Sequence, residues 1–389
     1  MRRPLAVLGL LVVLLAACRS SGRAEPAPAP EPLRPAWQPA SLPLPSGLSG
    51  RLALRDAAAC AGRWFVVGAV VDAAGVTRPA AWSSADAASW TPLRAVPRSP
   101  YGEENVLTAA GCRDGRLAAV GGKSGGVHGN PRISTWRQGA DGSLVEVPAE
   151  FEVFGGADAV NAGRIAGGSR GWLISGNRAT GAAAWVSPDG ADFRLVSAVP
   201  GLATDAGGRP WAADGTATAS GWLMVGSVQG SGRTGSAAVV WTSADGSAWR
   251  RAVLPGGDAD QDLQRVVRAG DRTVAVGRRG DGLGAWLGEG DAWRPGGGLG
   301  GAGTDRPGRV WGLAARGDGA WAVVAGSAAG AGWFSTDGTR WSPVALPVAV
   351  PAASDRTVAV AAAGEVALLL VDDGAGARVW SARGPWRPA

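Results

Sequence analysis

The 389-residue chain contains very few of the residue types on which most catalytic and metal sites depend. It has one histidine, His128, one tyrosine, Tyr101, and three cysteines. Histidine is the commonest protein ligand for metals and the usual general base in catalysis. We therefore expect no histidine-based metal site, no catalytic triad built on histidine and no cofactor.

Concentrated charge is also missing. The 38 basic and 32 acidic residues leave a formal net charge of +6, and no basic run or RNA-binding signature appears. We therefore expect no nucleic-acid partner. Long segments with a helical period are absent after residue 45, which favours an all-β fold.

The N-terminus has the pattern of an export signal. Arg2 and Arg3 precede the almost wholly apolar residues 4–17, and the tetrapeptide Leu-Ala-Ala-Cys ends at Cys18. The apolar segment is too short to span a membrane as a helix, so it is typical of a signal peptide. The tetrapeptide resembles the lipobox of bacterial lipoproteins, which implies an acylated Cys18, a cell-membrane anchor and an extracytoplasmic address. The alternative is a secretory signal that happens to end at a cysteine.

The next segment, residues 18–45, is rich in proline and alanine. Such a composition cannot form a core and favours extended polyproline geometry, so we interpret these residues as a disordered stalk. Trp37-Gln38-Pro39-Ala40 is similar to the C-terminal string that begins at Trp386. The N-terminal segment could therefore supply an outermost strand, and the sequence leaves open which terminus completes the fold.

Residues 46–389 contain an internal repeat. A tryptophan recurs at intervals of 45 to 56 residues, at Trp82, Trp136, Trp185, Trp241, Trp286, Trp333 and Trp380. Four of these positions begin a Ser-x-Asp turn that a second aromatic residue follows, and Asp-Gly favours a tight hairpin. A period near 50 with four short β-rich runs predicts a β-propeller of seven four-stranded blades.

The repeated turn, Ser-x-Asp-Gly-x-x-Trp, resembles the Asp-box, or BNR repeat, of sialidase-type propellers. It contains Asp86, Asp189, Asp245 and Asp337, with Ala87 in place of glycine in the first copy. The resemblance implies that these residues are structural turns at the rim, remote from any ligand site.

The longer connections are expected at the opposite face, around the mouth of the central channel. Arginine recurs near the start of the innermost strands, at Arg51, Arg209, Arg265, Arg309 and Arg356. Trp211 and Trp311 each follow an arginine by two positions, which places both side chains on one side of a strand. Such a pair could hold an anion and stack on a ring. The alternative is that both tryptophans pack between blades.

Two further groups are ambiguous in the sequence. Cys60 and Cys112 occupy nearly matching positions in blades 1 and 2, where a disulfide or two free thiols are both possible. Asp258, Asp260 and Asp262 alternate as in a calcium loop but lack its glycine and distal glutamate, so we expect a solvated acidic loop and no metal.

The leading hypothesis is a monomeric, non-catalytic scaffold that binds a glycan, a peptide or an envelope protein. The rival is a sialidase-like glycoside hydrolase, although the motif set of those enzymes is missing. Tyr101 with Glu103 and Glu104 is the chain's only tyrosine–carboxylate grouping. A third possibility is an assembly factor for an envelope complex, because propellers support unrelated functions.

Overall fold

A computed structural model describes residues 31–124, 131–230, 235–256, 260–289, 292–300, 308–325, 329–350 and 356–386. Cys18, His128, Asp258, the signal peptide and the first part of the expected stalk lie outside these residues. Within them, no helix has the length and apolar character needed to cross a membrane.

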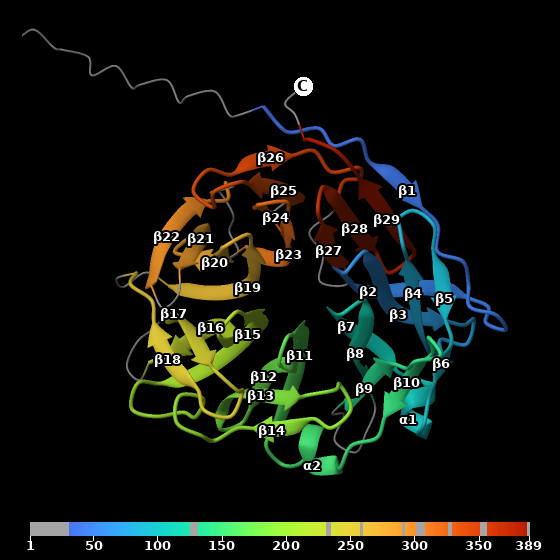
Figure 1. Ribbon diagram of the computed structural model, residues 1–389, viewed down its shortest axis with the longest axis horizontal. Coiled ribbons are helices and arrows are strands. Elements are labelled where there is room, and N and C mark those ends of the chain that lie inside the picture. Colours follow the sequence, from blue (N-terminus) through green and yellow to red (C-terminus); the bar gives the residue numbers. More distant parts are fainter. Residues whose placement is uncertain are drawn as a thin grey trace, which may run out of the picture. The chain divides into compact units, whose positions relative to one another are not determined.

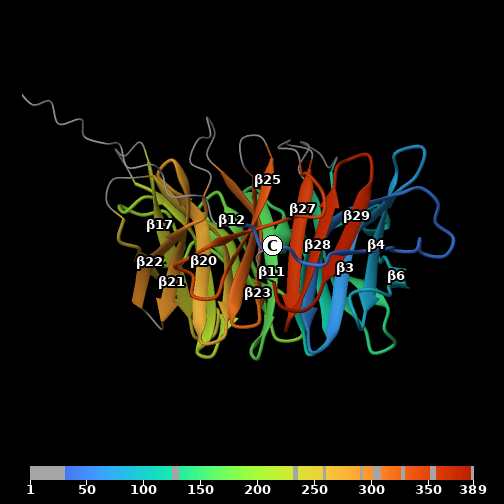
Figure 2. The ribbon, with the colours of Figure 1, turned by 90° about the horizontal axis from the view of Figure 1, so that it is seen from above.

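Seven sheets stand around a central axis, which confirms the predicted all-β, seven-bladed propeller (Figure 1). Their strands run along that axis, so the connections emerge at the two faces of the ring (Figure 2). Each blade places its first strand innermost. The innermost strands are β2 (Arg51–Cys60), β7 (Val106–Arg113), β11 (Ala159–Gly168), β15 (Arg209–Thr218), β19 (Gln261–Ala269), β23 (Arg309–Arg316) and β27 (Thr357–Ala363).

The second strand of each blade lies next to the innermost one, and the third strand carries the recurring tryptophan of the repeat. The second strands are β3 (Arg63–Val71), β8 (Arg116–Lys123), β12 (Gly171–Arg178), β16 (Gly221–Gln229), β20 (Arg272–Arg279), β24 (Gly319–Ala325) and β28 (Val366–Asp372). The third strands are β4 (Thr77–Ser84), β9 (Arg132–Gln138), β13 (Gly181–Ser187), β17 (Ser236–Ser243), β21 (Gly282–Glu289), β25 (Gly330–Ser335) and β29 (Ala377–Ala382).

The outermost strands are short. They are β5 (Thr91–Leu93), β10 (Leu144–Val147), β14 (Arg194–Val196), β18 (Arg250–Val253), β22 (Ala292–Gly298) and β26 (Ser342–Val344). A two-residue strand, β6 (Ala95–Val96), adds to blade 2 beside β10. Two one-turn helices, α1 (Pro100–Glu103) and α2 (Phe151–Phe154), lie in the connections before and after blade 2.

The N-terminal strand β1 (Gln38–Ala40) closes the ring. It pairs antiparallel with β29 as the outermost strand of blade 7. Just before it, Trp37 donates its indole N–H to the carbonyl of Ala345 at 2.8 Å. The Trp37 ring also lies 5.6 Å from that of Trp321 and 6.2 Å from that of Trp386.

The expected boundary between stalk and propeller at residue 45 is therefore wrong. The folded unit begins at Glu31, and Leu33 is already buried, with a bridge to Val344. The proline- and alanine-rich composition that indicated a stalk is compatible with a three-residue edge strand, because such a strand needs few side chains of its own.

The repeated tryptophans fill the space between blades. Trp82, Trp136, Trp185 and Trp241 are at most 1% exposed. Each also donates its indole N–H to the segment that precedes its own blade; the acceptors are the carbonyl of Pro43, the side-chain oxygen of Asn105 and the carbonyls of Val153 and Gly201. One side chain thus contributes a large apolar surface and fastens the incoming connection.

The Asp-box residues form the turns between third and fourth strands. Asp86 accepts hydrogen bonds from the amides of Ala88 and Ser89, both at 2.8 Å. Asp189 and Asp337 accept from two amides in the same way, and Asp245 from the amide and hydroxyl of Ser247. These bonds hold the pKa of Asp86 and Asp337 well below its usual value and lower that of Asp245 to about 2.

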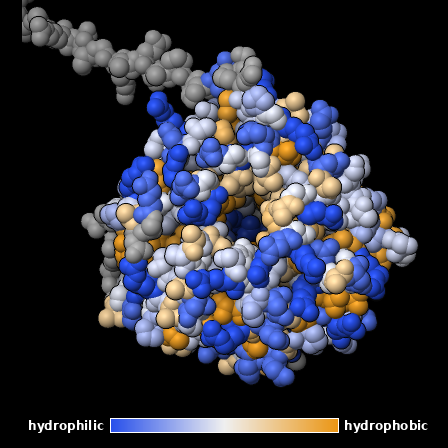
Figure 3. Space-filling view, viewed as in Figure 1, coloured by the Kyte–Doolittle hydropathy of each residue, from blue (hydrophilic) through white to orange (hydrophobic). Residues whose placement is uncertain are grey.

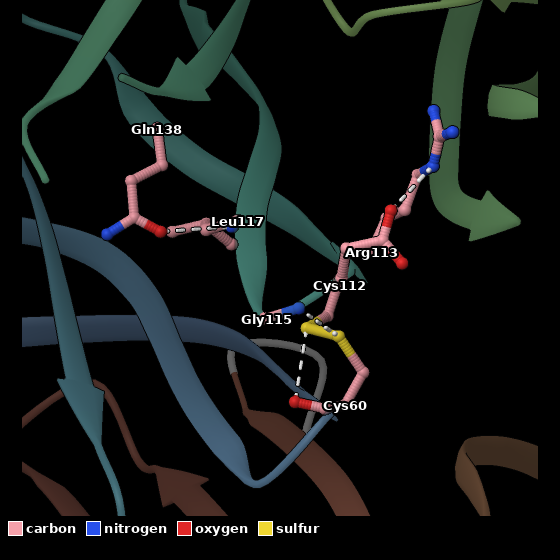
Figure 4. The surroundings of a disulfide bond; sticks show 7 residues. Cys60, Cys112, Arg113, Gly115, Leu117 and Gln138 are labelled. Carbon is pink, nitrogen blue, oxygen red and sulfur yellow. Dashed lines mark hydrogen bonds and ion pairs between the residues drawn. A yellow bond between two sulfur atoms is a disulfide. The ribbon is translucent and has the colours of Figure 1, made fainter. Parts of the chain in front are cut away.

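Blades 1 and 2 are linked covalently. Cys60 ends β2, Cys112 lies near the end of β7, and their sulfur atoms are 1.96 Å apart with Cα atoms at 5.7 Å (Figure 4). The structure thus contains a disulfide, where the sequence left free thiols open. It joins two innermost strands at the face that carries the Asp-box turns.

Candidate functional site

The mouth of the central channel carries exposed arginines. Arg51, Arg209 and Arg309 are the first residues of β2, β15 and β23, so all three lie at the same end of the channel. All three are exposed, and within the described part of the chain their side chains make no hydrogen bond or ion pair. Their charges are therefore available to an incoming anion.

Trp211 stands beside this basic mouth. It follows Arg209 by two positions on β15, and both side chains are exposed, whereas Pro210 and Ala212 between and after them are buried. The indole is 41% exposed, unlike most tryptophans of the chain. An exposed indole next to an unpaired guanidinium presents a flat apolar face and a hydrogen-bonding cation together.

Trp311 does not share this position, so its assignment to the ligand site is wrong. It is 7% exposed and belongs to the core between blades 6 and 7 with Val350, Val358 and Val360. The reason is a β-bulge in which Trp311 is the extra residue, between Val310 and Gly312. In β15 the bulge residue is Ala213, two positions beyond Trp211.

Counted from the bulge, Arg309 of blade 6 thus occupies the place of Trp211 in blade 4. Arg51 and Arg209 are equivalent in the same way, because the bulge residue of β2 is Arg55. An alignment of blades 4 and 6 on the pattern Arg-x-Trp is therefore wrong by two residues.

The two remaining candidates of the sequence are engaged within the protein. Arg356 bonds to the carbonyl of Asp373 and lies 3.9 Å from its carboxylate. Arg265 donates to the carbonyls of Gln264 at 2.7 Å and Trp311 at 3.3 Å. Neither guanidinium is free in the manner of Arg51 or Arg209.

Arg265 belongs to a group of four charged residues that sequence reasoning did not identify as a unit, and which we term the channel belt: Asp56, Arg164, Asp214 and Arg265. Each directly follows the bulge residue of an innermost strand, in blades 1, 3, 4 and 5. Each is a charged residue in a strand that the sequence predicts as innermost, but the strands of Asp56 and Arg265 carry other charged residues too, so the sequence does not mark these four.

The belt side chains meet at the ring axis. Arg164 lies 3.2 Å from the carboxylate of Asp56, although blades 1 and 3 are not neighbours, so the contact crosses the channel. The carboxylates also join adjacent blades, because Asp56 accepts from the amide of Ala110 at 2.9 Å and Asp214 from that of Val266 at 3.1 Å.

The pKa values within the belt reflect this crowding. Burial raises the pKa of Asp214. Burial opposes ionisation of Arg164 too, but the carboxylates of Asp56 and Asp214 outweigh it and raise its pKa. Burial, with repulsion from Arg164 and Arg309, lowers the pKa of Arg265 to about 10. Arg309 at the mouth is therefore within electrostatic range of the belt.

Beyond the belt, small apolar residues predominate in the channel, and Arg268 and Thr216 are its polar members. A cavity of about 300 Å³ is lined there by residues of all seven innermost strands, mostly alanines: Ala57, Ala58, Ala59, Ala110, Ala166, Ala314, Ala315, Ala361 and Ala362. Figure 3 shows the central hollow of the ring with hydrophilic residues at its floor. The two ends of the channel thus differ in polarity, and the basic end suits a charged ligand.

A second concavity, which we term the rim groove, lies beside blade 2. Its volume is about 790 Å³, and its lining includes Tyr101 of α1, Arg132 of β9 and Phe151 of α2. Figure 1 places α1 at the outer edge of the ring beside β10, and α2 farther along this edge, near β14. The sequence indicated Tyr101 only as a neighbour of carboxylates.

Glu104 near Tyr101 and two aspartates of the expected acidic loop are paired with cations. Glu104 lies 2.5 Å from Lys123, and this contact lowers the pKa of Glu104. Asp260 and Asp262 both contact Arg278, at 2.5 and 3.3 Å. Among the described residues, no cluster of three or more histidine, cysteine, aspartate or glutamate side chains could hold a metal ion.

No protein-family model and no curated protein sequence matches the chain. Solved structures match it in fold. The β-propeller domain of the Trilobed protease from Pyrococcus furiosus is 10% identical over 88% of this chain and 96% of that domain, with a TM-score of 0.51. That domain is described as having an open velcro topology, whereas β1 closes the ring here.

Two further solved structures are similar to the chain. A puromycin-hydrolysing peptidase of Mycobacterium tuberculosis is 13% identical over 85% of this chain, with a TM-score of 0.50; the chain spans about half of that enzyme, 52%. A subtype N11 neuraminidase-like protein of A/flat-faced bat/Peru/033/2010 (H18N11) is 9% identical over 92% of this chain and 98% of that one, with a TM-score of 0.47. The protease domain and the peptidase, at 10% and 13% identity, show the propeller fold alone.

Proposed function

We propose that this protein is a non-catalytic binding propeller of the bacterial cell envelope, whose basic mouth recognises an acidic glycan. The observation that carries the proposal is the set of three exposed, unpaired arginines at the mouth, one of them beside the exposed indole of Trp211. Guanidinium groups bind carboxylates and phosphates, and an indole face packs on a sugar ring.

The envelope address rests on the N-terminal pattern and on the disulfide. A lipid on Cys18 would hold the protein at the membrane, with the propeller on the extracytoplasmic side. The Cys60–Cys112 bond supports this address, because disulfides persist mainly in oxidising compartments. The Ser-x-Asp turns support a place among Asp-box propellers.

The rival, a sialidase-like hydrolase, has less support. The resemblance to sialidases implies that such an enzyme needs a tyrosine–carboxylate pair together with three arginines. Tyr101 instead shares the rim groove with one arginine, Arg132. Glu104 is committed to Lys123. An assembly factor for an envelope complex remains the second alternative, and co-purification from native membranes would identify its partner.

The test uses the purified full-length chain in detergent. Polygalacturonate, an acidic glycan, serves as the probe, and its methyl-esterified form is the matched neutral control. We expect salt-sensitive binding of the acidic polymer alone. Equal binding of both polymers, or turnover of a chromogenic glycoside by the protein, would overturn the proposal.

A further inference from the structure

The rim groove contains a guanidinium that contacts two aromatic rings. The central carbon of the Arg132 guanidinium lies 5.5 Å from the ring centre of Tyr101 and 5.0 Å from that of Phe151. Both rings are well exposed, at 45% and 56%. Large exposed aromatic side chains grouped around one cation are unusual on a protein surface without a ligand.

Within the described residues, the Arg132 side chain makes no hydrogen bond and no ion pair, and it contacts the two rings. Neither ring contact supplies a hydrogen-bond acceptor for the N–H groups of Arg132. Among the described residues these N–H groups are therefore unsatisfied, and a guanidinium can bind an oxyanion through two parallel hydrogen bonds.

The wall of the groove is built by Glu146 of β10. This carboxylate accepts hydrogen bonds from the amide and hydroxyl of Ser99, at 2.9 and 2.7 Å, and from the hydroxyl of Ser134 at 2.7 Å. Ser99 caps α1 by accepting from the amide of Gly102. A methyl group at Gly102 would lie 1.8 Å from the carboxylate, so a larger residue here would displace the Glu146 side chain from its hydrogen bonds. These contacts hold the backbone that carries Tyr101 beside β10.

The remaining lining selects what can accompany the oxyanion. Ile133, Val147 and Phe154 supply apolar surface, while the hydroxyls of Ser99 and Ser134 are already committed to Glu146. Few groups are left for the many hydroxyls of a sugar. Glu150 and Glu152 are exposed on the α2 side, where water and salt screen their charge.

Strand addition by a peptide is also disfavoured at this groove. The outer edge of β10 is paired with β6 at Leu144 and Val145. Farther along, the amides of Arg98 and Ser99 bond to the side-chain carboxylate of Glu146, so this segment of the chain lies beside that part of β10. A peptide could therefore enter with its terminal residue, but not as an additional strand.

We infer that the rim groove is a second binding site, for a carboxylate that carries a compact apolar group, such as the C-terminal residue of a peptide with an apolar side chain. Arg132 grips the carboxylate, Tyr101 and Phe151 hold Arg132 in place, and the apolar lining receives the side chain. The inference is independent of the basic mouth and of its glycan.

The test measures binding of N-acetyl-leucine to the full-length protein, with N-acetyl-leucinamide as the matched neutral compound. We expect the acid to bind and the amide to bind at least tenfold more weakly. Arg132→Gln should weaken binding of the acid at least tenfold. Arg132→Lys should weaken it severalfold, because a lysine keeps the charge but loses the planar fork.

Arg137→Gln is the matched control. Arg137 lies on the same strand, carries the same charge and pairs with Asp189 outside the groove. Phe151→Ala, at an exposed position, removes one of the two ring contacts of Arg132 without endangering the fold and should weaken binding severalfold. Equal affinity for acid and amide, equal effects of Arg132→Gln and Arg137→Gln, or preferential binding of glucuronate would each overturn the inference. Loss of glycan binding at the mouth would leave it standing, since the two probes differ.

Discussion

Asp56 and Arg164 form an ion pair of 3.2 Å across the centre of the ring, although they belong to blades 1 and 3. Asp56 simultaneously accepts the amide of Ala110 in blade 2. One carboxylate thus connects three consecutive blades. The belt holds the innermost strands together at the depth where the channel changes from basic to predominantly apolar.

The first prediction concerns this pair. Asp56→Ala leaves Arg164 and the Ala110 amide without their partner, and we expect it to destabilise the protein by about 3 kcal/mol or more. A double-mutant cycle with Arg164→Ala should give a coupling energy of about 1 to 3 kcal/mol, measured by urea unfolding. Additive effects of the two substitutions would show that the pair contributes nothing.

The disulfide provides the second prediction. It closes a loop of 52 residues, so replacing both Cys60 and Cys112 by serine should reduce the free energy of unfolding by about 4 kcal/mol. Reduction of the wild-type protein with dithiothreitol should cause a similar loss, and the double variant should not respond to it. Unchanged unfolding midpoints in both experiments would contradict the prediction.

The third prediction tests the closure of the ring. Trp37→Ala removes the contacts with Trp321 and Trp386 and the bond to Ala345, and we expect a loss of about 2 kcal/mol or more in thermal or urea unfolding. Trp211→Ala is the matched control for stability. Its ring is 41% exposed, so the change should stay within about 0.5 kcal/mol. Similar values for the two variants would mean that β1 does not hold the ring closed.

The Asp-box turns give a pH dependence. The pKa values of Asp86, Asp245 and Asp337 are lower in the folded protein than in the unfolded chain, where an aspartate titrates near 4. Their contribution to stability is therefore fully present above about pH 4 and is lost as the pH falls toward the folded value, about 2 for Asp245.

Replacement of these three aspartates by asparagine should lower stability at pH 7 and flatten its decline between about pH 4 and pH 2. Unfolding in urea at a series of pH values provides the measurement. Asp318→Asn, on an exposed turn between β23 and β24, is the control and should leave the curve unchanged. A triple variant with the full acid decline would place the pH dependence elsewhere.

The blade number and the Asp-box turns could be predicted because both depend on local sequence. The spacing of Trp82, Trp136 and their counterparts reports the length of a blade, and Ser-x-Asp-Gly specifies a hairpin within a few residues. The exposed pair Arg209 and Trp211 was likewise visible, because alternation along one strand suffices to place two residues on one side.

Other features depend on information that the local pattern does not contain. Trp311 is the bulge residue of β23, and its side chain lies in the core. Relative to the Arg-x-Trp pattern, the bulge of β15 in blade 4 comes two residues later. Asp56 and Arg164 are 108 positions apart, so nothing in either segment indicates the other. The rim groove combines two short helices from different connections, and neither has a helical pattern of its own.

The most direct test of the central claim compares two triple variants of the full-length protein. Arg51→Gln, Arg209→Gln and Arg309→Gln neutralise the mouth, whereas Arg116→Gln, Arg170→Gln and Arg340→Gln remove the same charge from exposed positions on the Asp-box face. A charged hydrogen bond contributes roughly 1.5 to 3 kcal/mol, so the mouth variant should bind polygalacturonate at least about tenfold more weakly than the wild type. The opposite-face variant should bind like the wild type. Equal weakening of both variants would show that net charge, and not a site at the mouth, accounts for binding.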